Sequence, residues 1–423
     1  MSAGYARRDG LLFCEGVSLE AIAGRTGTPV YVYSAAVIGQ RYEHLVSALA
    51  GLPVHVHYSV KANSSLSILA LLKSLGAGVD IVSGGELYRA LEVGFPGQDI
   101  VFSGVGKTAA ELQRAVAAGV RSINVESDGE LRALQEVACN MGVVAPVALR
   151  VNPDVAVDTP HPYTRTGEHG MKFGIPHDQI LPTARAMAAM PNVRLTGLAA
   201  HLGSQITDAA PYALAAQVLV RLKHDIEHAG LARIATLDLG GGLGVTHDEE
   251  VAPDLSAYAR ALGIAASEPG VAILVEPGRF LVADAGVLLT RVLYRKHSGG
   301  KEIVVTDAGM NDFIRPSLYE SHHTIEAVSA GDAPKLRANV VGPVCESGDF
   351  FATDRVIADV APGDLLVLRT AGAYGYSMAS NYNSRPRPAE VLVDGDRFAI
   401  ITERESEADL TCRETLVLEW IED

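Results

Sequence analysis

The sequence has few cysteines, few positive charges and no long apolar stretch, and each shortage excludes a class of protein. Its four cysteines lie far apart with no CxxC pair, which argues against a zinc site or a disulfide framework and favours a reduced, cytoplasmic compartment. The 35 lysines and arginines face 50 acids, a net charge of −15, so neither nucleic acid nor an anionic membrane is an expected partner. No run approaches the ~20 apolar residues of a membrane span, and the first residues lack the apolar core of a signal peptide.

The rest of the composition, 48% hydrophobic and 20% charged residues, is that of a folded globular protein. A chain of 423 residues exceeds what one hydrophobic core usually serves, so we expect two domains. Between about residues 50 and 280, eight β-type runs alternate with amphipathic helical patterns, and eight such strands close a (β/α)8 barrel of the TIM type. The runs are VHVHYSV, GVDIVS, DIVFSG, SINVES, PVALRVN, LTGLAAH, ATLDLGG and AILVEP.

Beyond residue 279 the sequence becomes rich in strand patterns and in Pro-Gly, Asp-Gly and Gly-Asp turns. The predicted fold class is therefore α/β plus β: a barrel over residues 30–280, followed by a β-sandwich or β-barrel over 281–423. Residues 1–29 are assigned to this second domain, to which they can supply a strand. The polar, glycine-containing segment 158–173 is long for a barrel loop, and we expect it to be mobile.

Lys61 is the most informative residue, because it stands at the end of the first predicted barrel strand, in HYSVKANSS. A lysine at that mouth is an ordinary rim residue in many barrels. Its ammonium would be buried there, however, unless its pKa falls or it is bound covalently, as in a Schiff base with an aldehyde. Other polar residues recur at predicted strand ends, where barrels hold their active sites: Asp80, Arg150, His201 and Glu276.

The turn Gly240–Gly241–Gly242 follows the seventh predicted strand, where barrels commonly bind phosphate. Taken alone, the GGGLG motif is weak, and Val245 stands where a dinucleotide fingerprint needs a third glycine. Glu276 is either an ion-pair partner of Arg279 or a carboxylate for a pyridine nitrogen. His201 is either a core histidine or a flat ring that stacks on a cofactor. Together with Lys61, these features favour a pyridoxal phosphate enzyme.

Three further motifs follow the barrel. Arg315 and Tyr319 are four residues apart and would share one face of a helix; a surface pair is the plainer interpretation. Cys345 is followed by Glu346 in a glycine-rich loop, an unusual setting for a buried structural cysteine. Tyr374, between two glycines of GAYGYSM, is either a turn aromatic or a ligand contact.

The motifs HYSVKANSS, HLGSQI, LDLGGGLG, EPGR, RPSLYE, CESGD and GAYGYSM occur in the order and spacing of diaminopimelate decarboxylases. The chain resembles this family, which belongs to the alanine-racemase-like pyridoxal phosphate enzymes, from about residue 28 to 378. The HPY…KFGI segment within residues 161–175 is similar to the family's as well. The resemblance implies decarboxylation of meso-2,6-diaminopimelate to L-lysine and CO2, the last step of lysine biosynthesis.

The resemblance also implies a role for each matching residue. Lys61 would bind the cofactor covalently, His201 would stack on its ring and Glu276 would pair with the ring nitrogen. The cofactor's phosphate would be bound by Ser204, Tyr374 and the turn Gly240–Gly242. Other expected cofactor contacts are Asp80, Arg150, Pro277, Gly278 and Arg279. The substrate's distal carboxylate would be held by Arg279, Arg315 and Tyr319 and its distal ammonium by Glu346, with Tyr374 also in the substrate pocket. Cys345 would donate a proton, from a loop that reaches the partner's barrel in a homodimer.

Three alternatives remain. The same chemistry could act on ornithine, arginine, carboxynorspermidine or a carrier-bound glutamyl group, although such relatives generally alter CESGD or RPSLYE, both intact here. A non-catalytic homologue would be expected to lack Lys61 or Cys345, and both are present. A racemase on a related barrel usually has a tyrosine–lysine pair and no CESGD loop.

Overall fold

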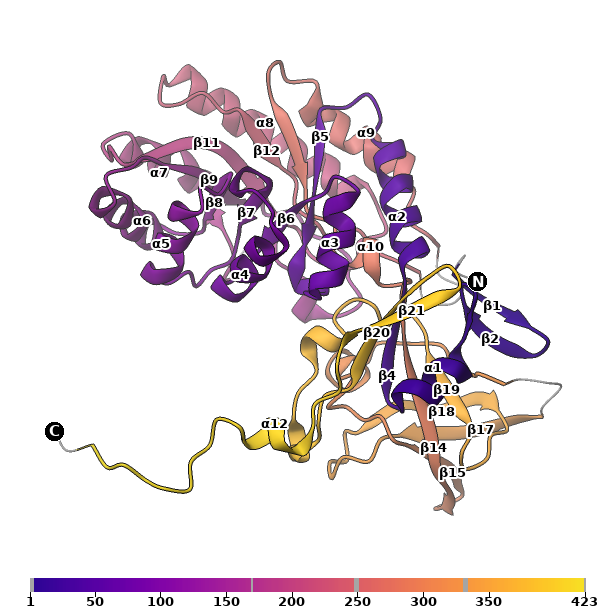
Figure 1. The fold of residues 1–423 in the computed structure, drawn as a ribbon. Coiled ribbons are helices and arrows are strands. Elements are labelled where there is room, and N and C mark those ends of the chain that lie inside the picture. Colours follow the sequence, from indigo (N-terminus) through magenta and orange to yellow (C-terminus); the bar gives the residue numbers. More distant parts are fainter. Residues whose placement is uncertain (1–3, 169, 247–250, 330–333, 422–423) are drawn as a thin grey trace. The chain divides into compact units, whose positions relative to one another are not determined.

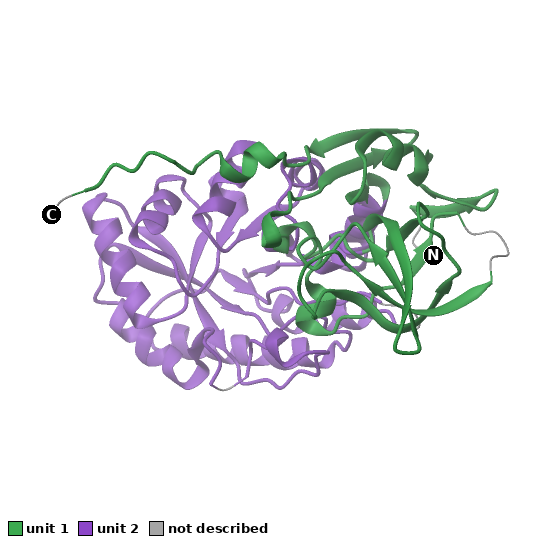
Figure 2. Ribbon diagram, turned by 90° about the horizontal axis from the view of Figure 1, so that it is seen from below, with its two compact units in different colours: residues 1–36, 284–423 green, residues 37–283 purple. Residues whose placement is uncertain are grey.

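A computed structural model describes residues 4–168, 170–246, 251–329 and 334–421 of the chain. The chain divides into two compact units (Figure 2): residues 37–283 form one, and residues 1–36 together with 284–423 form the other. The first unit is continuous in sequence, whereas the second is assembled from both ends of the chain. Within the described residues, no helix is long and apolar enough to cross a membrane.

Unit 37–283 is a closed barrel of parallel strands (Figure 1). Each strand pairs with its neighbour along the chain, and β13 returns to pair with β5, which closes the ring. All eight predicted runs form barrel strands, so the predicted fold is confirmed. They are β5 (Val54–Ser59), β6 (Gly78–Ile81), β7 (Ile100–Phe102), β8 (Ser122–Val125), β9 (Ala145–Asn152), β11 (Val193–Ala200), β12 (Thr236–Asp238) and β13 (Ala272–Val275). The two-residue strand β10 (Ile175–Pro176) adds to β9 outside the ring.

Helices follow the strands and turn their apolar faces toward the barrel. In α4 (Gly84–Val93), Leu87 and Ala90 are buried three residues apart, as expected of an amphipathic helix. Ser83 caps its first turn and Gly94 ends it in the left-handed conformation. The other helices of this unit are α2 (Ala35–Ala48), α3 (Leu66–Ser74), α5 (Ala109–Ala117), α6 (Asp128–Asn140), α7 (Ile180–Met187), α8 (Ala210–His228), α9 (Leu255–Ala266) and α10 (Arg279–Val282).

The other unit contains two antiparallel-rich sheets. A small one joins β1 (Tyr5–Arg8), β2 (Leu11–Cys14) and β3 (Val17–Ser18). The large one has the order β18–β17–β15–β14–β4–β20–β21; off this path, β19 pairs with β14 and β16 pairs with β19. Its strands are β4 (Val30–Ser34), β14 (Gly286–Ser298), β15 (Lys301–Thr306), β16 (Ile325–Ala327), β17 (Lys335–Val341), β18 (Phe350–Ala358), β19 (Leu365–Leu368), β20 (Ala389–Asp394) and β21 (Arg397–Thr402).

The strand β4 lies inside this sheet, although its residues fall in the range predicted for the barrel. It pairs antiparallel with β14 and parallel with β20. Its apolar side chains join a core with residues of β1, β2, β14, β19 and β20, including Leu12, Val32, Leu289 and Val391. Three short helices complete the unit: α1 (Leu19–Thr26), α11 (Arg315–Tyr319) and α12 (Glu407–Thr411).

Candidate active site

A cavity of about 380 Å³ opens at the carboxyl ends of the barrel strands. This is the end of a (β/α)8 barrel at which active sites are built, and the volume is within the range of small-molecule sites. The cavity is lined by four of the residues predicted from the sequence together with neighbours from the strand ends. The lining residues are Lys61, Val82, Ser103, Gly104, Val105, Gly106, Asn124, Arg150, Thr166, Phe173, Ala199, Ala200, His201 and Glu276.

Lys61 lies in a one-turn 3-10 helix, Val60–Ala62, that directly follows β5. Its Nζ is 3.6 Å from Oδ2 of Asp80, which is fully buried and also accepts a hydrogen bond of 2.7 Å from the Ser59 hydroxyl. The Lys61 side chain remains 34% exposed. The Lys61 ammonium is therefore less buried than its place at the barrel mouth predicted. The amine is open to the cavity and has a carboxylate beside it.

Glu276 follows β13 and shares the barrel interior with two other buried acids. Its carboxyl accepts a 3.4 Å hydrogen bond from Ser103 Oγ and interacts electrostatically with the carboxyl of Asp238. Burial, and next the negative charges of Asp238 and Asp80, raise the pKa of Glu276 well above its usual range. Burial likewise raises the pKa of Asp238 to about 6. These carboxyls hold a proton readily, and a cationic group in the cavity would favour ionisation of Glu276.

His201 follows β11 and borders the same cavity. Its Nδ1 accepts a 3.1 Å hydrogen bond from the Gly241 amide. Burial, followed by the positive charges of Lys61 and Arg150, lowers the pKa of His201 well below its usual range. The ring is therefore neutral at physiological pH, and its orientation is fixed by the glycine turn. A neutral, fixed aromatic ring suits stacking on a flat ligand.

The glycine turn packs tightly against the strand ends on both sides. A Cβ on Gly241 would lie 2.2 Å from the backbone oxygen of Glu276, so only glycine permits this approach. The Gly240 amide donates to Asp238 Oδ1 at 2.9 Å, and the Gly242 oxygen accepts from the Ile206 amide at 2.9 Å. The turn thus connects the ends of β11, β12 and β13. Two of its amides, those of Gly240 and Gly241, already donate hydrogen bonds to Asp238 and His201.

The EPGR motif leads from β13 into the short helix α10. The Pro277 oxygen accepts a 3.2 Å hydrogen bond from the Ser59 amide, beside Lys61. Gly278 precedes the helix and Arg279 begins it. Arg279 donates from Nη2 to the hydroxyl of Ser204 at 2.9 Å. Two residues predicted to bind anionic groups of cofactor and substrate are therefore in direct contact.

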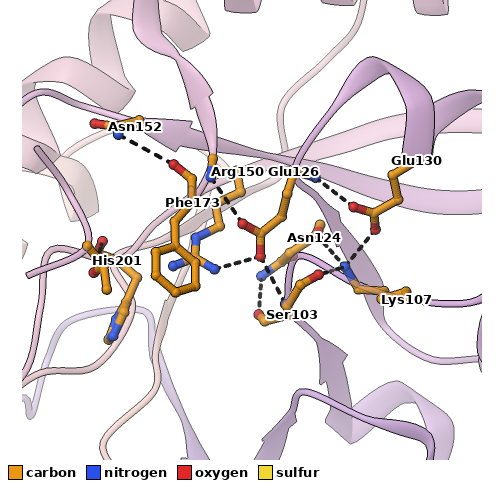
Figure 3. A network of polar contacts seen from close by, with 12 residues as sticks. Ser103, Lys107, Asn124, Glu126, Glu130, Arg150, Asn152, Phe173 and His201 are labelled. Carbon is orange, nitrogen blue, oxygen red and sulfur yellow. Dashed lines mark hydrogen bonds and ion pairs between the residues drawn. The ribbon is translucent and has the colours of Figure 1, made fainter. Parts of the chain in front are cut away.

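Arg150 stands in β9 and borders the cavity; Figure 3 shows its side chain between those of Glu126 and Phe173. Its Nη1 donates to Glu126 at 2.6 Å, and its guanidinium lies 4.9 Å from the ring centre of Phe173. The segment that ends at Phe173 was expected to be mobile. Residue 169 lies outside the described residues, and the remainder makes several backbone hydrogen bonds, including those from Thr166 and Gly167 to the Leu202 oxygen.

The predicted substrate-binding residues of the β-rich unit form a group of their own. Arg315 opens α11 and is buried, which excludes the interpretation as a surface pair. Its guanidinium lies 5.4 Å from the ring centre of Tyr319 and 5.8 Å from that of Tyr374. Tyr374 has a φ of +56° in its glycine-flanked turn. A buried arginine between two tyrosines can bind a carboxylate with little competition from water.

The CESGD loop is held in shape by its last residue. The Asp349 carboxylate accepts hydrogen bonds of 2.6 Å from the amides of Val344 and Met310. The Cys345 amide donates to Asn383 Oδ1 at 2.7 Å. The side chains of Cys345 and Glu346 are exposed. The loop therefore presents a thiol and a carboxylate on a fixed backbone.

Two acids of the barrel interior were missed at the sequence level, Asp238 and Glu126. Glu126 directly follows β8, so the strand-end rule that selected Lys61 and Glu276 could have found it. Asp238 is the last residue of β12, so the same rule could have found it, but only the glycine turn that follows was selected. The same rule would also have selected Ser103 after β7.

The cavity fits the pyridoxal group in three respects. It offers an amine that is accessible to an aldehyde, a neutral ring fixed at its edge and a buried acid that would gain from a cationic nitrogen. The tight glycine turn and Ser204 lie at the strand ends where barrels hold phosphate. A (β/α)8 barrel with these groups defines a pyridoxal phosphate enzyme of the barrel type.

Comparison with known proteins gives the same class and a family within it. Residues 35–283 match the family model described as the pyridoxal binding domain of pyridoxal-dependent decarboxylases. The chain is 47% identical to a diaminopimelate decarboxylase of Neisseria meningitidis serogroup B, over 93% of this chain and 95% of that protein. It is 48% identical to that of Pseudomonas aeruginosa, over 98% and 99%.

A solved structure agrees. The diaminopimelate decarboxylase of Helicobacter pylori complexed with L-lysine superposes with a TM-score of 0.89 at 38% identity, covering 93% of this chain and 98% of that one. The chain belongs to the diaminopimelate decarboxylase family, and its cofactor is pyridoxal phosphate.

Proposed function

We propose that the chain decarboxylates meso-2,6-diaminopimelate to L-lysine and CO2. The observation that carries this proposal is the gathering of Lys61, His201 and Glu276 around one barrel cavity in a chain whose full-length relatives are diaminopimelate decarboxylases. The lysine bound to the Helicobacter pylori relative is the product expected of this reaction. Related decarboxylations, racemisation and a non-catalytic role find no comparable support.

When bound, pyridoxal phosphate supplies an electron sink for the electron pair left by the departing carboxylate. The chain's residues bind and orient the reactants around it. Lys61 provides the amine for covalent attachment, and the Asp80 carboxylate lies 3.6 Å from its nitrogen. Glu276 would hold its carboxyl at the ring nitrogen, with the buried carboxyl of Asp238 acting on it electrostatically. His201, held by Gly241, would cover one face of the ring.

Phosphate binding is assigned to Ser204, the turn Gly240–Gly242 and Tyr374. Support comes from the Arg279–Ser204 contact, which brings a cation to the hydroxyl, and from the close packing of the turn on the strand ends. Backbone amides at such turns and hydroxyl groups bind phosphate oxygens well. Pro277 and Gly278 fix the start of α10 beside this region, while Asp80 and Arg150 complete the cofactor's surroundings.

Substrate recognition is assigned to Arg279, Arg315 and Tyr319, which would bind the distal carboxylate, and to Glu346, which would bind the distal ammonium. Tyr374 would border the same pocket. The far end of diaminopimelate is itself an amino-acid head group, with one carboxylate and one ammonium. A guanidinium pairs with a carboxylate through two parallel hydrogen bonds, and a carboxylate suits an ammonium. A substrate whose far end carries only an amine would leave the arginines unpaired.

Cys345 is proposed to donate the proton that replaces CO2. Its exposure on a fixed loop supports a role toward a group outside that loop. We further propose a homodimer in which this loop completes the barrel site of the partner. Domain functions follow from this: the barrel binds the cofactor, and the β-rich domain supplies substrate-binding and dimer-interface loops. All four cysteines are free, which supports a reducing, cytoplasmic location.

The test is CO2 release by the purified protein from meso-diaminopimelate, lysine, ornithine and arginine, each offered separately with pyridoxal phosphate. We expect release from diaminopimelate alone. Lys61→Ala should abolish both turnover and the visible absorption of the bound cofactor, whereas Lys296→Ala, at an exposed lysine, should change neither. Faster release from ornithine or arginine would refute the proposed substrate, and a persistent absorption band in Lys61→Ala would refute the role of Lys61.

A further inference from the structure

Four buried charges form a chain behind the cavity wall (Figure 3). Lys107 Nζ lies 2.6 Å from Glu130 Oε1, and Arg150 Nη1 lies 2.6 Å from Glu126 Oε1. The exposed fractions of these side chains are between 1% and 8%. The Glu126 amide donates to Glu130 Oε2 at 3.1 Å and connects the two pairs. Buried charges of this kind are costly unless each one is matched, and here two cations match two anions.

The Glu126 carboxylate binds three donors from separate parts of the chain. Oε1 accepts from Arg150 in β9 and, at 3.0 Å, from the amide of Gly104 in the turn after β7. Oε2 accepts from the amide of Gly174 at 3.0 Å. Gly174 ends the long segment that connects β9 to β10. One side chain therefore joins a strand, a turn and the end of a loop.

All three donors belong to the cavity wall. Arg150 and Gly104 line the cavity themselves, and Gly174 directly follows Phe173, which also lines it. Gly174 has a φ of +71°, and a Cβ there would lie 2.9 Å from the Asn152 amide nitrogen. Glycine is thus required for the loop to return this close to β9. Phe173 is held over the Arg150 guanidinium from the opposite side.

We infer that Glu126 is a positioning residue of the active site, which fixes Arg150 and the Phe173–Gly174 end of the loop as one wall of the cofactor cavity. Replacing it with glutamine leaves a buried guanidinium without its anion and only one acceptor oxygen for three donors, of which Gly174 is one. The uncompensated cation then opposes a second positive charge in the same cavity, at the nitrogen of Lys61. The charge argument rests on the proposed attachment of the cofactor to Lys61; the anchoring of the loop does not.

The first test measures hydrogen exchange in the cofactor-free protein. In Glu126→Gln, peptides covering residues 170–176 should exchange at least about tenfold faster than in the wild type, because their anchor is weakened. Glu136→Gln, at an exposed glutamate of α6, changes the net charge equally and should have no effect. Wild-type exchange in Glu126→Gln would overturn the inference.

The second test follows the visible absorption of the bound cofactor as a function of pH. Glu126→Gln should shift its midpoint downward by about 0.5–1 pH unit, a three- to tenfold loss of proton affinity. Glu130→Gln removes the other buried acid but leaves the Glu126–Arg150 pair, so a purely structural role predicts equal effects in both variants. The inference requires a shift in Glu126→Gln alone, and equal shifts or none would overturn it.

Two further variants keep the inference testable if Glu126→Gln folds poorly. Glu126→Asp retains the charge with a shorter reach, so it should speed exchange at 170–176 while keeping the midpoint near the wild-type value. The double variant Glu126→Gln/Arg150→Met removes both charges and should restore the midpoint, and failure to do so would contradict the charge argument. If the wild type showed no cofactor band, the attachment at Lys61 would be wrong, and the exchange result alone would decide on Glu126.

Discussion

Single carboxylates join distant parts of this chain. Glu126 holds three segments of the barrel, and Asp349 fixes the loop that carries Cys345. Glu405 does the same in the β-rich unit: it accepts hydrogen bonds from the Arg387 side chain and amide, at 2.7 and 2.8 Å, and from Asn381 at 2.6 Å. Partial burial alone would raise the pKa of Glu405, but these donors outweigh it and lower the pKa to about 2.

This lowered pKa predicts an acid-dependent contribution to stability. Glu405→Gln should reduce the free energy of unfolding at pH 7 by about 1–2 kcal/mol, because the ionised form is stabilised only in the folded protein. A lowered pKa gives stability that is complete above the unfolded value of 4.5 and is lost as the pH falls toward 2. Urea unfolding at several pH values measures it. Glu403→Gln, at an exposed site, is the control. A difference in unfolding free energy between Glu405→Gln and the wild type that did not change with pH would contradict the prediction.

Residue types at strand ends were sufficient to find much of the barrel site. Lys61, Arg150, His201 and Glu276 were all selected by that rule, and all line the cavity. The rule cannot give partners, because these depend on how the closed barrel brings strand ends together. The contact between Glu126 and Gly174 joins residues 48 apart in sequence, and no local pattern indicates it.

At the scale of elements, the neighbouring barrel helices α4 and α5 are joined through their first turns. Thr108 and Glu111 form a capping box at the start of α5. Glu111 also accepts a 2.7 Å hydrogen bond from the Gly84 amide at the start of α4. One helix start therefore supports the next around the outside of the barrel.

Loss of this cap should destabilise the barrel unit. Thr108→Ala removes the oxygen that accepts the Glu111 amide and should lower the free energy of unfolding by about 1 kcal/mol, the usual effect of losing an N-cap. Thr108→Ser keeps the hydroxyl and should stay close to the wild type. Chemical denaturation measures both, and equal losses in the two variants would show that the hydroxyl is not responsible.

The barrel elements could be predicted because their strands are short apolar runs separated by clear helices. The β-rich unit was only partly predictable. The run RVIADVAPGDLLVLR contains the end of β18, a turn and β19, which pair with different strands. β17 was not predicted, although its apolar and polar residues alternate with the period of a strand. Its place between β15 and β18 is set by pairing with distant strands.

At the scale of the whole molecule, the proposed site needs residues from both units: Lys61 from the barrel and Cys345 from the β-rich part. In a symmetric dimer with shared sites, each site takes the two from different chains. This arrangement makes a quantitative prediction for mixtures of two inactive variants.

Lys61→Ala and Cys345→Ala should each lose activity, by about 10²-fold or more for the proton donor. Unfolded and refolded together in equal amounts, they should regain about a quarter of the wild-type activity, because half of the dimers are mixed and each has one intact site. Decarboxylation measured before and after mixing tests this. No recovery, with mixed dimers demonstrated by differential tagging, would mean that each site is built from one chain.

The central position of β4 has a consequence for biosynthesis. The barrel is continuous in sequence and can fold as soon as it leaves the ribosome. β4 emerges before it, yet pairs with β14 and β20, and β20 begins only at Ala389, more than 350 residues after β4. At elongation rates of about 5–20 residues per second, this strand waits on the order of tens of seconds for its second neighbour. During that interval the nascent chain carries an unpaired apolar strand, which is a natural target for ribosome-associated chaperones.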